Sequence, residues 1–369
     1  MARPLDASFH PVTGEPHLIV GLATSVELKV LTVNELEDSS TVSTEFRGHR
    51  DQILNAACSR DGRWLVSISR DGTTRVWDRR NSAWRRVWRT PEVTCVGIRS
   101  DGQKVVTGQR DGTTTLWDIS RDEPDRVFPG DATAVTAVVF SPNGDCLAAG
   151  EERGAVRIWR LEGDTTSISM RVEPSQAKVT SLAFGPLRGQ FAVGTGDHRL
   201  FAYEMQHGPP ADSTPKLRLS LQGHSGPILG IAYSPDGKRI VSGSEDSSAK
   251  IWDADTGAEA LTLIGRSDHV RRVLFSPDGD SILTLGGGTN LWRSALPHRH
   301  SLPVHEEARH RMELAECERE RHWFGVRWHA DWLIKNSGEA PDLFWRRGDA
   351  LAELGEWSAA DVDFSAALA

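Results

Sequence analysis

The sequence repeats one unit of about forty residues, and this repetition limits the possible folds more than any other feature. The unit is clearest at 48–78, GHRDQILNAACSRDGRWLVSISRDGTTRVWD, and returns at 223–253 as GHSGPILGIAYSPDGKRIVSGSEDSSAKIWD. A shorter echo, RDGTTTLWD, ends at Asp118. Both long copies keep the same spacing between their His and their final Trp. Unrelated loops would rarely share that spacing, so the chain is built from repeated structural units.

Each unit has the pattern of a small antiparallel sheet. Three β-rich runs lie between Ile53 and Trp77, separated by turn signals at Asp61-Gly62 and Asp71-Gly72. A fourth run, 84–89, precedes the next copy. One such sheet cannot bury both of its faces alone, so we expect the sheets to stack on their neighbours.

Four polar or aromatic residues recur at fixed places in the two complete copies. They are His49, Ser67, Asp71 and Trp77 in one, and His224, Ser242, Asp246 and Trp252 in the other. The spacing predicts that Asp71 accepts a hydrogen bond from His49, and that Ser67 links this His to the Trp77 indole. Buried polar groups are tolerated when they satisfy one another, so we expect both sets to be structural.

These residues resemble the WD40 repeat, which is bounded by Gly-His and Trp-Asp. The resemblance implies an all-β seven-bladed β-propeller, here predicted over residues 1–304. The turn glycines that mark the phase are Gly14, Gly62, Gly102, Gly144, Gly189, Gly237 and Gly279. The first copy starts almost at Met1, which leaves no spare strand to complete the last blade. Three alternatives follow: segment 295–304 covers blade seven, blade packing alone closes the ring, or the chain is part of a longer protein.

After about residue 305 the hydrophobic period changes from that of strands to that of helices. Residues 341–369, PDLFWRRGDALAELGEWSAADVDFSAALA, read as two helices joined at 354–356 and resemble a tetratricopeptide repeat. The preceding stretch, 306–336, resembles a degenerate copy of the same pair. We therefore predict a small all-α helical-hairpin segment over 305–369, with tetratricopeptide-like character.

The composition is that of a globular protein with an acidic balance. The formal net charge of −8 argues against general binding to nucleic acid. The opening residues, MARPLDASFH, lack an apolar signal region, and the sequence has no apolar run of about 20 residues. The cysteines are Cys58, Cys95, Cys146 and Cys317, with no C-x-x-C pair. We expect thiols in a reducing compartment, and hence a cytoplasmic protein.

The candidates for catalysis and metal binding fail on spacing. Gly223-His224-Ser225-Gly226 suggests a nucleophile elbow, but Pro227 occupies the position of the final Gly. The His-rich run 298–310 lacks the His-Glu-x-x-His spacing that places two imidazoles on one helical face. We predict no catalytic residue, no metal site and no cofactor, and therefore a protein that is not an enzyme.

Loop residues beside the networks are the better candidates for contact with a partner. In a propeller, the loop before the first strand and the turn after the second strand share one face. On that face we expect Arg50, Arg70, Arg110, Glu151, His198 and Glu245. Their mixed signs suit a protein or peptide better than a polyanion. On the tail, Trp345, Asp349 and Glu353 would line the groove of a complete tetratricopeptide repeat.

A second patch interleaves arginines with tryptophans on the outer edge of blade two. Its members are Arg79, Arg80, Trp84, Arg85, Arg86, Trp88 and Arg89. Such a pattern could hold nucleic acid or an acidic protein, whereas the alternative is that the charges protect an edge strand.

The sequence predicts a non-catalytic protein–protein interaction scaffold. The combination of repeats resembles bacterial WD40 proteins and the sensory portions of bacterial Ser/Thr kinases, which implies a role in signalling. The rival functions are a nucleic-acid-associated propeller that uses the Arg/Trp edge, and a hydrolase whose site the sequence does not reveal.

Overall fold

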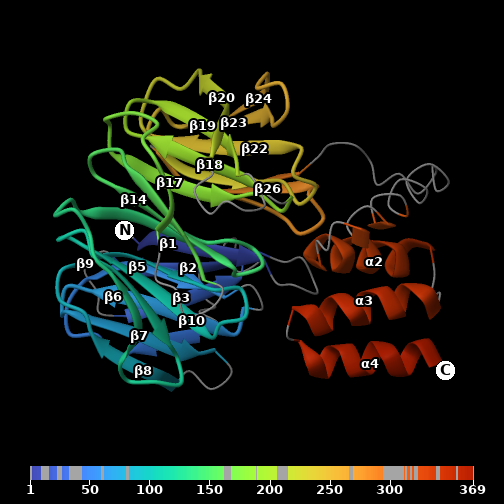
Figure 1. Ribbon diagram of the computed structural model, residues 1–369. Helices are drawn as coiled ribbons and strands as arrows, with labels where there is room; N and C mark the ends of the chain where they lie inside the picture. The colour runs from blue at the N-terminus through green and yellow to red at the C-terminus, as the bar shows by residue number, and fades with distance from the viewer. Residues whose placement is uncertain are drawn as a thin grey trace. The chain divides into compact units, whose positions relative to one another are not determined.

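A computed structural model shows the chain as two compact units, one of strands and one of helices (Figure 1). The described residues are 2–9, 16–22, 27–32, 44–59, 62–79, 83–161, 168–187, 189–205, 215–265, 269–293, 311, 314–315, 318–319, 323–337, 341–354 and 356–368. The strand unit ends at Arg293. The predicted boundary, at 304 and 305, lies outside the described residues.

The strands form seven antiparallel sheets in chain order. Blade one holds β1 (Ala2–Phe9), β2 (Pro16–Leu22), β3 (Glu27–Thr32) and β4 (Thr44–Arg47). Blade two holds β5 (Ile53–Cys58), β6 (Trp64–Ser69), β7 (Thr73–Asp78) and β8 (Ala83–Arg89). Blade three holds β9 (Val93–Ile98), β10 (Lys104–Gln109), β11 (Thr114–Asp118) and β12 (Pro124–Phe128). Blade four holds β13 (Val135–Phe140), β14 (Cys146–Glu151), β15 (Val156–Arg160) and β16 (Ile168–Val172).

The remaining blades continue the same meander. Blade five holds β17 (Val179–Phe184), β18 (Gln190–Thr195), β19 (Arg199–Glu204) and β20 (Lys216–Gln222). Blade six holds β21 (Ile228–Tyr233), β22 (Arg239–Ser244), β23 (Ser248–Asp253) and β24 (Glu259–Ile264). Blade seven holds β25 (Val270–Phe275), β26 (Ser281–Gly286) and β27 (Thr289–Arg293), three strands among the residues described. The predicted all-β seven-bladed propeller is therefore confirmed.

The ring closes through its innermost strands. Each first strand packs against the first strand of the next blade, and β1 packs against β25 and β26 of blade seven. Blades one and seven thus meet by packing of neighbouring sheets. The predicted covering segment, 295–304, lies outside the described residues.

Burial falls from the middle of each blade to its outer edge. Every residue of β6 and of β14 is buried, whereas most of β8 is exposed. The second strands are largely buried along their length and consist mainly of apolar and small residues, because neighbouring blades cover both of their faces. The turn glycine between the first and second strands has positive φ in blades two to seven, for example 68° at Gly62. This is the conformation that only glycine adopts without strain.

The helical unit contains α2 (Trp323–Ser337), α3 (Pro341–Glu353) and α4 (Trp357–Leu368). Leu333 of α2 and Leu343 and Ala350 of α3 share one apolar core. In α3, Gly348 lies so close to α4 that a Cβ there would come within 2.5 Å of the Phe364 ring. The predicted small all-α segment is confirmed as to fold class. None of the described helices is both long and apolar enough to span a bilayer.

Candidate functional site

In blade two, four side chains form one hydrogen-bonded chain. The Trp77 Nε1–H donates to Ser67 Oγ at 2.9 Å, and Ser67 Oγ lies 2.8 Å from His49 Nε2. His49 Nδ1 lies 2.9 Å from Asp71 Oδ2, which also accepts from the Arg50 amide at 2.9 Å. Because the ionised Asp71 can only accept, Nδ1 of the neutral His49 carries the proton, and Nε2 is left to accept from the Ser67 hydroxyl.

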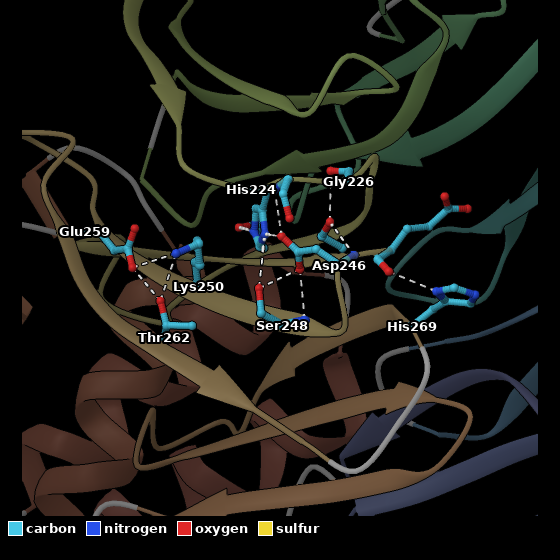
Figure 2. Close-up of polar contacts among 12 residues, drawn as sticks. His224, Gly226, Asp246, Ser248, Lys250, Glu259, Thr262 and His269 are labelled. Atoms are coloured by element: carbon cyan, nitrogen blue, oxygen red, sulfur yellow. Dashed lines mark hydrogen bonds and ion pairs between the residues drawn. The ribbon is translucent and has the colours of Figure 1, made fainter.

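Blade six repeats this geometry, and Figure 2 shows the contact between its His224 and Asp246. His224 Nδ1 lies 2.8 Å from Asp246 Oδ2, and its Nε2 lies 2.8 Å from Ser242 Oγ. The Trp252 Nε1–H donates to that same oxygen at 2.8 Å. Asp246 also accepts from the Ser225 amide at 2.9 Å, so the network ties the loop before the first strand to the turn after the second.

The ionisation of both networks is set by burial and hydrogen bonding. Burial lowers the pKa of His49 and of His224 below the usual value, although the neighbouring carboxylate opposes this shift. Burial would raise the pKa of Asp71 and Asp246, but hydrogen bonds from hydroxyl, amide and imidazole groups outweigh it and lower each pKa to about 2. Each network therefore holds a neutral imidazole beside a carboxylate near neutral pH. Its Ser hydroxyl donates to the imidazole inside the blade and accepts from the indole, so these groups serve structure.

Other blades keep only parts of the network. The Trp117 indole donates to Thr107 at 2.9 Å in blade three, and the Trp292 indole donates to Thr284 at 3.0 Å in blade seven. In these two blades the hydroxyl that accepts from the indole is thus retained although the His is not.

Blade four corrects one predicted contact residue. Glu151 was expected on the loop face, but it is buried at 1% exposure and its Oε1 lies 2.6 Å from the Nε of Arg157, also 1% exposed. The same guanidinium donates to the carbonyl of Pro129 at 2.6 Å and to that of Gly112 at 2.7 Å. Burial raises the pKa of Glu151, and the charge of Arg157 opposes the shift. The ion pair lies within blade four, and the hydrogen bonds of its guanidinium join that blade to blade three, so both residues are structural.

The other predicted loop residues are exposed. They are Arg50, Arg70, Arg110, His198 and Glu245. Arg110 forms an ion pair with Glu92, with Nε and Oε2 3.0 Å apart. The Glu245 backbone carbonyl lies 3.0 Å from the Nδ1 of His269, which belongs to the loop before β25 (Figure 2). The loop face thus carries charges of both signs, three arginines and the carboxylates of Glu92 and Glu245, all on exposed side chains.

The Arg/Trp edge of blade two divides into two groups. Trp88 is buried, stacks on Trp117 with ring centroids 5.0 Å apart, and donates to the Arg121 carbonyl at 3.1 Å. Arg86 donates to the carbonyls of Ile119 at 3.0 Å and Ser120 at 2.6 Å, and also contacts Asp122. These two residues fasten blade two to blade three. Trp84, Arg85 and Arg89 remain exposed.

On the helical unit, the three predicted groove residues are exposed: Trp345, Asp349 and Glu353. Trp345 is 43% exposed and its ring lies 5.0 Å from that of Phe364 on α4. The sequence did not single out Arg347, which contacts Asp363 through two hydrogen bonds of 2.6 Å and Asp331 through a third of 2.6 Å. One arginine thus joins α2, α3 and α4.

Two hollows are present in the strand unit. One, of 510 Å³, lies between blades two and three and is lined in part by Trp84, Arg85 and Ile119. The other, of 250 Å³, lies among the innermost strands and is lined in part by Thr180 and Arg271. Within the part of the chain that the structure describes, no three His, Cys, Asp or Glu side chains gather as a metal site would require. The His-rich run 298–310 lies outside that part.

The stacked meanders and the His–Ser–Trp–Asp networks define a propeller of the WD40 type. Four segments match the family model described as WD domain, G-beta repeat: residues 40–78, 86–118, 122–160 and 215–253. These four segments match WD40 repeats, and they lie within the β-propeller fold.

The chain is also similar to curated proteins of eukaryotes. Periodic tryptophan protein 2 of Saccharomyces cerevisiae is 30% identical over 243 residues, which are 64% of this chain and 23% of that protein. WD repeat-containing protein slp1 of Schizosaccharomyces pombe is 28% identical over 170 residues, 45% of this chain and 33% of that protein. Protein LST8 homolog of Dictyostelium discoideum is 26% identical over 237 residues, 64% of this chain and 62% of that protein. The chain thus spans only part of each relative.

A solved structure shares the fold. The β-propeller domain of Cps50 (Swd1) from Myceliophteria thermophila matches with a TM-score of 0.67 and 19% sequence identity, over 79% of this chain and 96% of that chain. At this identity the likeness concerns the fold alone. The tetratricopeptide-like character of the tail and the similarity to bacterial WD40 proteins and kinases stay predictions.

Proposed function

We propose that the protein is a non-catalytic protein–protein interaction scaffold, in which the loop face of the propeller binds a protein or peptide partner. The observation that carries this proposal is the contrast between the networks and the loops beside them. The His, Ser, Asp and Trp side chains bond to one another inside the blades. The residues next to them, such as Arg50 and Arg70, extend into solvent and differ from blade to blade.

The loop face suits a protein partner because its charges are mixed. Complementary patches of both signs give specificity in protein interfaces. A rigid ring of blades also holds the loops in fixed positions, which lowers the entropy lost on binding. The buried location of the Ser67 and Ser242 hydroxyls favours a role other than catalysis.

The test is affinity capture from cells with the wild type and with Arg70→Glu/Arg110→Glu. We expect the variant to lose partners that the wild type retains, because two cations of the face change sign. The matched control is Arg239→Glu/Lys238→Glu, which makes the same change at exposed residues where β22 begins, at the other end of the blades. Identical partners for all three proteins would show that the loop face is not the binding surface.

A cytoplasmic location and a role in bacterial signalling complete the proposal. The location is supported by Cys58, Cys95 and Cys146, which are thiols in the structure. The signalling role is supported only by the resemblance in the sequence. The tail, with Trp345 exposed beside Asp349, would add a second binding element of tetratricopeptide type.

Nucleic-acid binding at the Arg/Trp edge is the second candidate, favoured by the exposed Trp84, Arg85 and Arg89. Binding of this kind weakens steeply with salt because counterions are released. The test is fluorescence anisotropy with single-stranded DNA and RNA at low salt. An absence of binding under these conditions would exclude nucleic-acid binding.

A further inference from the structure

The hollow between blades two and three lies at the end of the blades opposite the loop face. It is bordered where β6 begins at Trp64, where β8 begins at Ala83 and where the chain leaves β11 through Ile119. The loop-face residue Arg70 follows β6 at its other end, and Arg50 precedes β5, whose Ile53 pairs with Ser69 at that same end. The hollow is thus a surface separate from the one proposed above.

An exposed tryptophan forms one wall of this hollow. Trp84 is 60% exposed, although it pairs across strands with the fully buried Trp77. The residues that pair in the same way with the third-strand aromatics of blades three to six are Pro124, Ile168, Leu217 and Glu259. Blade two alone in this set places an indole there. The anchoring of the strand is performed by Trp88, so Trp84 is not needed for that purpose.

The floor of the hollow is the Trp64 ring, and its rim combines Arg63 and Arg85 with the polar side chains of Gln103 and Ser120. Trp64 is buried, and Arg63 lies over its ring with the guanidinium carbon 4.6 Å from the centroid. Arg85 is exposed beside Trp84. Asp78, the carboxylate that lines the hollow, already contacts Arg63 at 3.2 Å. A pocket with an indole wall and arginines at its rim has the residue types that dominate binding energy in interfaces.

The shape and the charge favour an acidic peptide over nucleic acid. Single-stranded nucleic acid requires a basic track and several stacking platforms. Here Arg86 is occupied by blade three and Trp88 is buried, so the interleaved pattern does not continue along the strand. The volume of 510 Å³ is that of a small-ligand pocket, enough for an apolar side chain and its flanking backbone.

We infer that this hollow is a second docking site, which takes an acidic peptide segment of a partner protein through an apolar or aromatic anchor side chain. The anchor packs between Trp84 and the Trp64 floor, and a flanking carboxylate pairs with the exposed Arg85. The inference rests on the proposed scaffold function and adds a second surface to it. A scaffold with two such surfaces can hold two partners at once.

The experiment is selection of random short peptides, displayed on phage, against the full chain, followed by affinity measurement of the enriched peptides. We expect the enriched set to include acidic sequences with one large apolar residue, whose affinity for Trp84→Ala and for Arg85→Glu falls by about tenfold or more. The controls are Trp357→Ala, which removes a 68% exposed tryptophan of α4, and Arg89→Glu, which changes the same strand at its other end. Both controls should bind such peptides as the wild type does.

The outcomes separate this inference from the proposed function. If no enriched peptide loses affinity for Trp84→Ala, or if those that do carry no acidic residues, the docking site is refuted. If Trp84→Ala instead weakens binding of a single-stranded oligonucleotide, nucleic acid replaces the peptide as the ligand. Capture of partners by the loop face is tested with Arg70→Glu/Arg110→Glu, so either surface can fail while the other stands.

Discussion

At the scale of single residues, the two complete networks show what sequence spacing can predict. The interval from His49 to Trp77 fixes where each polar group falls on its strand, and so predicted a contact between two residues far apart in sequence. Glu151 shows the limit of prediction from sequence spacing, because its burial was not predicted. Blade four has Ala149 at the position that Ser67 and Ser242 occupy in blades two and six. The pattern of those two blades therefore did not indicate a buried partner for Glu151. The available signal was Arg157, a charged residue between the apolar Val156 and Ile158 of one strand.

Acid should destabilise the protein through the histidines of the networks. The pKa of His224 is lowered in the folded state, so below about pH 6.5 the unfolded chain binds protons more readily than the folded chain does. Stability is therefore greatest above that pH and falls as the pH decreases toward the lowered pKa. Asp246, with a pKa of about 2, adds stability that is lost at still lower pH, below about 4.

The check is urea unfolding of the wild type and of His224→Ala at about pH 7.5 and about pH 5.5. At the higher pH the variant should lose about 1–3 kcal/mol, because the partly buried Asp246 loses its His224 donor and the buried Ser242 hydroxyl loses its acceptor. It should also show a smaller difference between the two pH values than the wild type. His269→Ala, a change outside the network, should retain the wild-type difference. An unchanged pH dependence in His224→Ala would contradict this account of the network.

At the scale of elements, the blades differ in how their first loops are fastened to their hairpins. Blades two and six use a neutral imidazole and a carboxylate, whereas blade four uses a full ion pair between β14 and β15. The strand and turn positions followed from the alternation of apolar runs and glycine turns. The sequence did not show which side chains of the Arg/Trp edge are buried. Trp84 and Trp88 lie on the same strand, and only the packing of Trp88 against blade three distinguishes them.

Removing one partner of the buried Glu151–Arg157 pair in blade four should lower the free energy of unfolding. Arg157→Met leaves the carboxylate of Glu151 buried without its cation, and we expect a loss of about 3–5 kcal/mol in the free energy of unfolding. The double variant Arg157→Met/Glu151→Gln removes both charges and should recover part of that loss. Arg110→Met breaks the exposed pair with Glu92 and should cost about 1 kcal/mol or less. Equal effects for Arg157→Met and Arg110→Met would mean that burial does not govern the strength of the pair.

At the scale of the whole molecule, the repeat predicted seven sheets, because only stacking can cover both faces of each one. It did not predict how the ring closes, since that depends on the packing of β1 against β25 and β26, two ends of the sequence with no shared motif. The change of hydrophobic period predicted the helices of the tail. It did not predict the role of Arg347 in joining the helices. A single arginine on an amphipathic helix is expected to face solvent, and only the structure shows Asp331 and Asp363 beside it.

The division into two compact units predicts that they lose structure separately. Arg347→Met leaves Asp363, which is buried in the helical unit, without its cation, so α2, α3 and α4 should open more readily. Hydrogen exchange followed by mass spectrometry should show reduced protection across 323–368 and unchanged protection in the second strands of the blades. Arg346→Met, which breaks a more exposed pair with Glu318, should leave both units near the wild-type level. If protection fell equally in the blades, the two units would form one cooperative structure, and the tail would be part of the fold that presents the loop face.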